Sequence, residues 1–145
     1  MSLIKILIDA DGCPVVDITI ALAAKSHVKC TILCDTSHVF EKPGANTITV
    51  SKGADSVDFA IVNLVKCGDI VITQDYGLAA MCLAKRAVVL SQDGMVYNDS
   101  NIDALLLQRH TAKKIRMSGG RLKGSQKRTS AQDIAFEATL KPLLL

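Results

Sequence analysis

The chain has few aromatic residues: two tyrosines, three phenylalanines and no tryptophan among 145 residues. A surface that stacks bases on aromatic rings is therefore not expected, and any bound nucleic acid would be held mainly through its phosphate backbone. No apolar run approaches the roughly 18–20 residues that a membrane span needs, and the N-terminus lacks the pattern of a secretory signal. These absences predict a cytoplasmic protein without a membrane partner.

Cysteine is present, but without the C-x-x-C spacing of zinc or redox sites. Most of the cysteines lie in apolar segments, which is typical of reduced packing residues in a cytosolic protein. One of them follows an acidic turn, but no neighbouring histidine is available to activate it as a nucleophile. The five are Cys13, Cys30, Cys34, Cys67 and Cys82.

What the chain has instead is aliphatic residues: 49% of it is hydrophobic and only 3% is aromatic. Parallel sheets buried on both faces have this composition. Apolar runs alternate with segments of helical periodicity, which indicates an α/β fold. The sequence predicts strands at 3–8, 28–34, 47–50, 69–73 and 87–90, and helices at 14–26, 54–66, 76–85, 101–114 and 130–141.

A chain of this length is expected to form one domain with a substantial core. We predict a single domain over residues 1–145, folded as a three-layer α/β/α sandwich around a mainly parallel sheet of about four or five strands. The handedness of parallel crossovers places the first and fourth strands near the sheet centre. Asp93-Gly94 predicts a turn, and Ser130 with Asp133 predicts a capping-box start for the last helix. Asp99 or Ser100 is the expected cap of the helix before it.

The net charge of +3 is unevenly distributed. Residues 1–108 carry eight Lys/Arg and twelve Asp/Glu, whereas residues 109–145 carry nine and two. An acidic core with a basic C-terminal loop and helix, from about residue 117 onward, suits an anionic polymer presented to a metal pocket. The alternative is a solvated tail that is merely basic.

Five aspartates follow apolar segments or begin helices: Asp9, Asp11, Asp55, Asp58 and Asp75. The carboxyl ends of strands in open α/β sheets form ligand crevices. Carboxylates that meet there repel one another unless a hard cation such as Mg²⁺ or Mn²⁺ lies between them. The alternative is structural, because aspartate is a common turn and N-cap residue.

Three motifs resemble those of the YaiI/YqxD family, bacterial proteins with a PIN-like domain. Residues 8–15 resemble its opening D-A-D-x-C-P-V, and residues 53–58 resemble its G-x-D-x-x-D. Residues 68–80 resemble its G-D-I-V-I-T-x-D-x-x-L-A-A, although Tyr76-Gly77 stands where Ile-Pro is usual. Gly12 replaces a usual alanine and Ser125 a common proline. The C-terminal pattern is matched by Gly124, Lys127-Arg128-Thr129, Asp133 and Phe136.

The resemblance implies a PIN-like fold, Mg²⁺ or Mn²⁺ bound by carboxylates, and cleavage of RNA. Carried over residue by residue, it implies that Asp9, Asp58 and Asp75 are metal ligands. Asp55 is a further candidate metal ligand. The candidate catalytic residues are Asp9, Asp11, Asp58 and Asp75. The residues predicted to contact nucleic acid are Ser37, His38, Arg116, Arg121, Lys123, Lys127 and Arg128, with Arg109 as an additional phosphate contact.

The leading hypothesis is a metal-dependent nuclease-like protein acting on nucleic acid, with RNA favoured. Two alternatives remain open. One is a non-catalytic nucleic-acid-binding or regulatory module. The other is a phosphatase of the haloacid-dehalogenase type, because Asp9-Ala10-Asp11-Gly12 also resembles D-x-D-G. There Asp9 would be the nucleophile, Asp11 the general acid, and Thr73 and Lys85 would take the remaining roles. The sequence is also compatible with a homo-oligomer.

Overall fold

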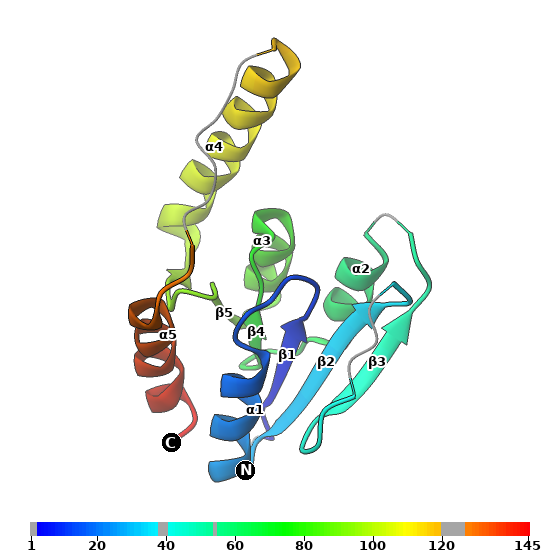
Figure 1. Ribbon diagram of the computed structural model, residues 1–145, viewed down its shortest axis with the longest axis vertical. Coiled ribbons are helices and arrows are strands. Elements are labelled where there is room, and N and C mark those ends of the chain that lie inside the picture. Colours follow the sequence, from blue (N-terminus) through cyan, green and yellow to red (C-terminus); the bar gives the residue numbers. More distant parts are fainter. Residues whose placement is uncertain (1–2, 38–40, 54, 120–126) are drawn as a thin grey trace.

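The computed structural model describes residues 3–37, 41–53, 55–119 and 127–145. One sheet forms its centre, with the strand order β3-β2-β1-β4-β5-β6. Helices cover both faces of the sheet, which confirms the predicted α/β/α arrangement around a mainly parallel sheet (Figure 1). The strands are β1 (Lys5–Asp9), β2 (Lys29–Asp35), β3 (Asn46–Val50), β4 (Ile70–Ile72), β5 (Val88–Leu90) and β6 (Val96–Tyr97).

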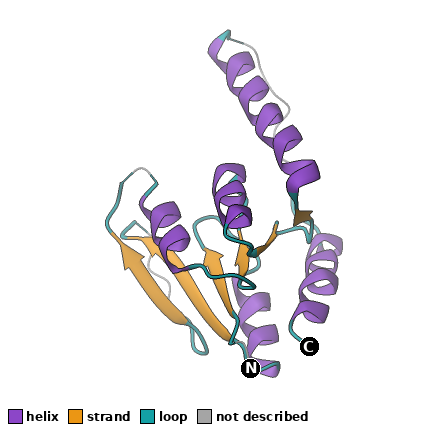
Figure 2. Cartoon of the chain, turned by 180° about the vertical axis from the view of Figure 1, so that it is seen from behind, coloured by secondary structure: helices purple, strands orange, loops and turns teal. Residues whose placement is uncertain are grey.

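The helices begin and end close to the predicted boundaries. Four of them lie along the sheet, while α4 projects away from it (Figures 1 and 2). Among the described residues, none of the helices has both the length and the apolar character needed to cross a membrane. The helices are α1 (Val16–Lys25), α2 (Ser56–Leu64), α3 (Tyr76–Ala84), α4 (Asp99–Met117) and α5 (Ser130–Leu143).

The middle residues of β1 and all of β4 are buried on both faces of the sheet, as the apolar stretches Ile6–Ile8 and Ile70–Ile72 predict. Successive side chains of a strand point to opposite faces of the sheet. Ile6 and Ile8 therefore pack against α1 and α5 on one face, and Leu7 packs against α2 and α3 on the other. β1 pairs in parallel with both neighbours, and Ile8 stands between Ile32 of β2 and Ile72 of β4. This register brings the ends of β1 and β4 to the same edge of the sheet.

The last strand was not predicted. The expected turn at Asp93-Gly94 reverses the chain, and β6 then pairs antiparallel with β5, giving six strands instead of four or five. β6 has only two residues, too few for an alternating pattern to show. Gly94 has φ +83°, and a Cβ there would lie 2.5 Å from the Ala135 carbonyl oxygen of α5. The turn therefore packs directly against the C-terminal helix.

Both predicted helix caps were displaced by one or two residues. The capping box of α5 is formed by Thr129 and Gln132, and the Gln132 side chain accepts from the Thr129 amide at 2.8 Å. The predicted pair, Ser130 and Asp133, is wrong by one position. At α4, the Asn98 side chain accepts from the amides of residues 100 and 101, both at 2.9 Å, so Asn98 takes the role expected of Asp99 or Ser100.

The C-terminal helix is part of the core. Phe136 and Leu140 of α5 are fully buried in the same cluster as Val16 and Ile20 of α1. The alternative of a solvated basic tail is therefore wrong for α5. The charged and polar residues of α5 lie on its other side, as expected for a helix covering one face of a sheet.

Candidate functional site

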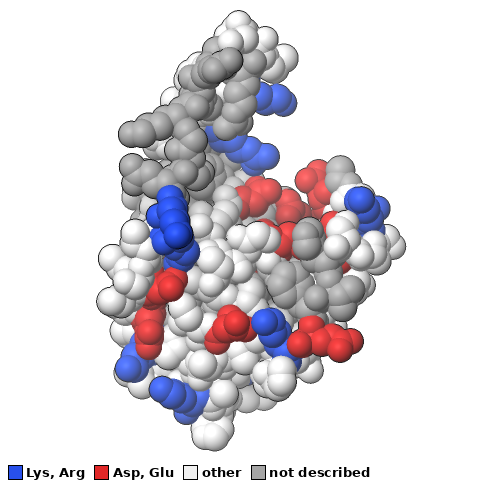
Figure 3. Space-filling model, in the orientation of Figure 1, with Lys and Arg blue, Asp and Glu red and all other residues white. Residues whose placement is uncertain are grey.

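The predicted aspartates come together at the carboxyl edge of the sheet. Asp9 is the last residue of β1, and Asp75 follows β4 as the N-cap of α3. Asp58 lies in the first turn of α2, and Asp55 is its N-cap residue. Figure 3 shows acidic side chains gathered beside the end of α4 that lies nearest the sheet, below basic side chains of that helix.

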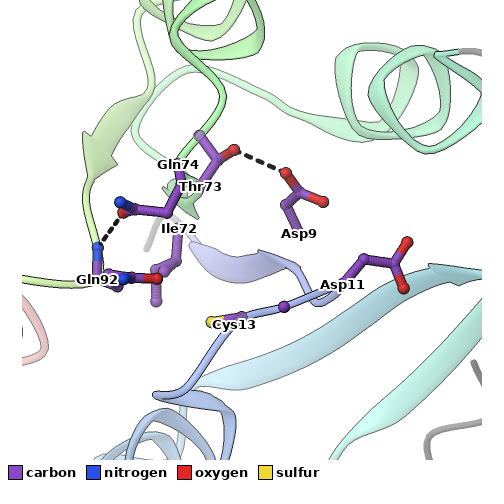
Figure 4. A pocket seen from close by; sticks show the side chains of 8 residues that line it. Asp9, Asp11, Cys13, Ile72, Thr73, Gln74 and Gln92 are labelled. Atoms are coloured by element: carbon purple, nitrogen blue, oxygen red, sulfur yellow. Dashed lines mark hydrogen bonds between the residues drawn. The ribbon is translucent and has the colours of Figure 1, made fainter. Parts of the chain in front are cut away.

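Thr73 links the Asp9 carboxylate to the backbone of Asp75. Its hydroxyl donates to Asp9 Oδ2 at 2.7 Å and accepts from the Asp75 amide at 3.0 Å. The Tyr97 hydroxyl in turn donates to the Thr73 carbonyl oxygen at 3.1 Å, from the unpredicted strand β6. Figure 4 shows Thr73 and Asp9 facing each other, with the Asp11 carboxylate lying apart from them. The position of Asp9 is thus fixed by β4 and β6 as well as by its own strand.

Asp75 has two partners besides Thr73. Its Oδ1 accepts from the Leu78 amide at 3.1 Å, capping α3, and lies 3.4 Å from Arg109 Nη1 of α4. Gly77 lies against this pair: a Cβ there would stand 3.2 Å from Asp75 Oδ1, which is a tight contact, and 3.5 Å from Arg109 Nη1, which is an ordinary van der Waals contact. Tyr76-Gly77, which stands where the family motif usually has Ile-Pro, therefore lies beside the acidic site.

Two open hollows flank this ion pair. The β1 hollow, of about 470 Å³, is lined by Asp9, Asp11, Gln74, Asp75, Tyr76 and Arg109. The α2 hollow, of about 310 Å³, is lined by Asp55, Asp58, Phe59, Asp75, Gly77, Leu78, Met81 and Arg109. A smaller cavity of about 80 Å³ lies behind Asp9, between the first acidic turn and residues 72–74 (Figure 4). Asp75 and Arg109 line both open hollows.

The carboxylates destabilise one another's charge. Burial raises the pKa of Asp9, against the opposing Thr73 hydrogen bond, and the charges of Asp75 and Asp11 raise it further. Burial, followed by the charges of Asp75, Asp9 and Asp55, raises the pKa of Asp58 to about 6, while Arg109 acts in the opposite direction. The cations among the described residues therefore do not offset the rise in either pKa.

Replacing Asp58 by asparagine should change how stability depends on pH. The folded pKa of Asp58 lies above its ordinary value, so its contribution to stability is lost as pH rises through about 6. Between about pH 4 and pH 7.5, the free energy of unfolding should shift in favour of Asp58→Asn by about 1 kcal/mol, a value reduced by solvent screening of this half-buried group. Urea unfolding in chelator at both pH values measures it.

Asp103→Asn is the matched control, because Asp103 is exposed on α4 and lines neither hollow. A stability difference for Asp58→Asn that stays constant with pH would contradict the electrostatic account of this cluster.

The donor atoms fit a hard divalent cation in kind and charge, since they are all carboxylate oxygens. Their present arrangement is more open than a formed metal site: among the described residues, no three acidic, histidine or cysteine side chains converge closely enough to hold one ion. One oxygen of Asp9 is engaged by Thr73, and one of Asp75 by Leu78 and Arg109. Binding one ion between them would require these side chains to move closer together.

The predicted nucleic-acid contacts are only partly described. Ser37 is exposed, and its amide donates to Asp35 Oδ1 at 2.7 Å in a turn after β2. Lys127 is exposed. His38, Arg121, Lys123 and the side chain of Arg116 lie outside the described residues.

Arg128 has a structural role in this arrangement. Its Nε donates to Asp133 at 2.8 Å, Nη1 to Asp93 at 2.9 Å and Nη2 to the Gln92 carbonyl oxygen at 2.8 Å. The guanidinium therefore ties α5 to the β5–β6 turn. A nucleic-acid contact by Arg128 stays a prediction, and it would compete with three intramolecular hydrogen bonds.

Comparison with known proteins agrees with the motifs. Residues 7–145 match the family described as the uncharacterised YaiI/YqxD family. The chain belongs to the YaiI/YqxD family. A UPF0178 protein of Exiguobacterium sibiricum is 53% identical over 97% of this chain and 96% of its own length. A UPF0178 protein of Clostridium acetobutylicum is 45% identical over 97% of both chains. No solved structure matches the chain.

Two features of this YaiI/YqxD chain were not assigned to the site from its sequence. Arg109 was predicted only as a phosphate contact, although it reaches Asp75 from a helix distant in sequence. Asp35 ends β2 at the same sheet edge, two residues beyond the pair formed by Asp9 and Leu33. The criterion that selected Asp9, an aspartate at the end of a strand, would also have selected Asp35.

Proposed function

We propose that the protein is a metal-dependent phosphodiesterase of the PIN-like type that acts on nucleic acid, with RNA favoured. The observation that supports this most strongly is the gathering of Asp9, Asp58 and Asp75 at one sheet edge, where burial and then the neighbouring negative charges raise the pKa of Asp9 and Asp58. A hard cation relieves such repulsion, and carboxylates are its preferred ligands.

In this proposal Asp9, Asp58 and Asp75 hold Mg²⁺ or Mn²⁺, with Asp55 and Asp11 beside them. The bound ion supplies an activated water and neutralises charge on the phosphate. Thr73 holds the Asp9 carboxylate in place through its 2.7 Å hydrogen bond. The open hollows admit a polymer backbone more readily than an enclosed pocket would, which favours a phosphodiester over a small phosphomonoester.

The phosphatase alternative requires Lys85 in the same site as Asp9, and the fold separates the two. Lys85 follows the C-terminal end of α3, whose N-terminal end is capped by Asp75. About nine residues of helix separate the two, or roughly 14 Å along the axis. Lys85 therefore stands at the far end of α3 from Asp9 and cannot serve the same site.

Asp9→Asn tests the proposal. Asparagine keeps an oxygen that can accept from the Thr73 hydroxyl but removes the charge, so the fold should be preserved. We expect Mn²⁺ affinity, measured by electron paramagnetic resonance, to fall at least about tenfold. Mn²⁺-dependent cleavage of a labelled single-stranded RNA should be lost in parallel. Metal-independent RNA binding with no cleavage by the wild type would support the non-catalytic module instead.

A further inference from the structure

Arg109 is the one basic residue among the described residues that line the two open hollows. It lies on α4, the helix that projects from the sheet, and it faces aspartates contributed by β1, α2 and the β4–α3 connection. Because it lines both hollows together with Asp75, the ion pair separates the Asp9 side of the site from the Asp58 side.

The ion pair is loose. Its 3.4 Å separation is longer than the roughly 2.7–2.9 Å of a strong charge-assisted hydrogen bond. The Arg109 side chain is 59% exposed and the Asp75 side chain 32% exposed. Pairs exposed to this degree contribute little stability and are readily exchanged. Arg109 can therefore leave Asp75 at small cost when a stronger cation arrives.

The surroundings allow this movement. Gly77 has no side chain, so the space beside the Asp75 carboxylate and the Arg109 guanidinium is open. Within the described part of the chain, Arg109 makes no hydrogen bond or ion pair other than that with Asp75, whereas Arg128 is fixed by three hydrogen bonds. A guanidinium released from Asp75 would remain at the rim of both hollows, where its planar fork suits a phosphate.

We propose that Arg109 is an exchangeable counter-cation of the site: it pairs with Asp75 in the metal-free protein and binds a substrate phosphate once a divalent ion has taken Asp75. This inference rests on the proposed function and adds, to the phosphate contact already predicted for Arg109, a competition between arginine and metal for Asp75.

Arg109→Met tests both halves of the inference, because methionine keeps an extended apolar side chain and removes the charge. Mn²⁺ affinity should rise about twofold to fivefold, since the competing cation is gone. Affinity for uridine 5′-monophosphate in the presence of Mn²⁺ should fall about tenfold, since a charged hydrogen-bond donor is lost. Arg109→Lys should restore part of the phosphate affinity, because the charge returns without the bidentate fork.

Lys113→Met is the control for long-range charge. Lys113 is exposed one helical turn further along α4 and lines neither hollow. The inference is overturned if Arg109→Met and Lys113→Met change Mn²⁺ affinity equally, or if Arg109→Met leaves nucleotide affinity unchanged. In both cases the wild type still binds Mn²⁺ and the proposed function stands. A wild type that binds no Mn²⁺ overturns the proposed function together with this inference.

Discussion

Phe136→Ala is expected to lower the free energy of unfolding by about 3–5 kcal/mol, the cost of removing a fully buried phenylalanine from a packed core. Phe136 is completely buried in the cluster that joins α5 to α1 and to one face of the sheet. Its ring therefore holds the C-terminal helix on the domain. Urea unfolding followed by far-UV circular dichroism measures the loss.

Ile134→Ala is the matched control on the same helix. Ile134 is 67% exposed, so truncating it should change stability by no more than about 0.5 kcal/mol. Similar small losses for both variants would mean that α5 does not share the core, and the solvated-tail interpretation would return.

The positions of the elements were predictable because local signals agree with the tertiary structure. Apart from Lys5, the run at residues 3–8 is apolar without alternation, and Ile6, Leu7 and Ile8 of β1 are buried on both faces as that pattern predicts. Phe136 and Leu140 are four residues apart, which is the spacing of one helix face, and they pack side by side in the core. β6 and the shifted caps escaped prediction because they depend on one or two residues, whose polar side chains can serve as caps at several neighbouring positions.

The site was predictable to a different degree. A strand-end aspartate can be identified from sequence, and the parallel register of β1 and β4 then brings Asp9 and Asp75 together. The Asp75–Arg109 pair could not be inferred, since 34 residues separate its members and the direction of α4 is set by tertiary packing. The same limit applies to Arg128, because two of its three partners, Asp93 and Gln92, lie about 35 residues away in the sequence.

Asp75→Asn is expected to weaken Mn²⁺ binding by roughly 100-fold, the largest effect of any single change at the site. Asp75 lines both hollows, so its charge acts on an ion held on either side. One unit charge a few ångströms from the ion is worth up to about 4 kcal/mol at a partly exposed site, and solvent screening reduces this to the roughly 2.7 kcal/mol that corresponds to a 100-fold change. Isothermal titration at fixed ionic strength measures the change.

The comparison with Asp75→Ala separates charge from folding. Asparagine can still accept from the Leu78 amide and cap α3, whereas alanine loses this bond, which stands at 3.1 Å in the wild type. We expect Asp75→Ala to lose about 1 kcal/mol of stability in urea, and Asp75→Asn to lose much less. Both variants should lose Mn²⁺ binding equally if the charge is the ligand. If only Asp75→Ala lost it, the binding defect would follow from the disordered start of α3, and Asp75 would be a structural cap and not a metal ligand.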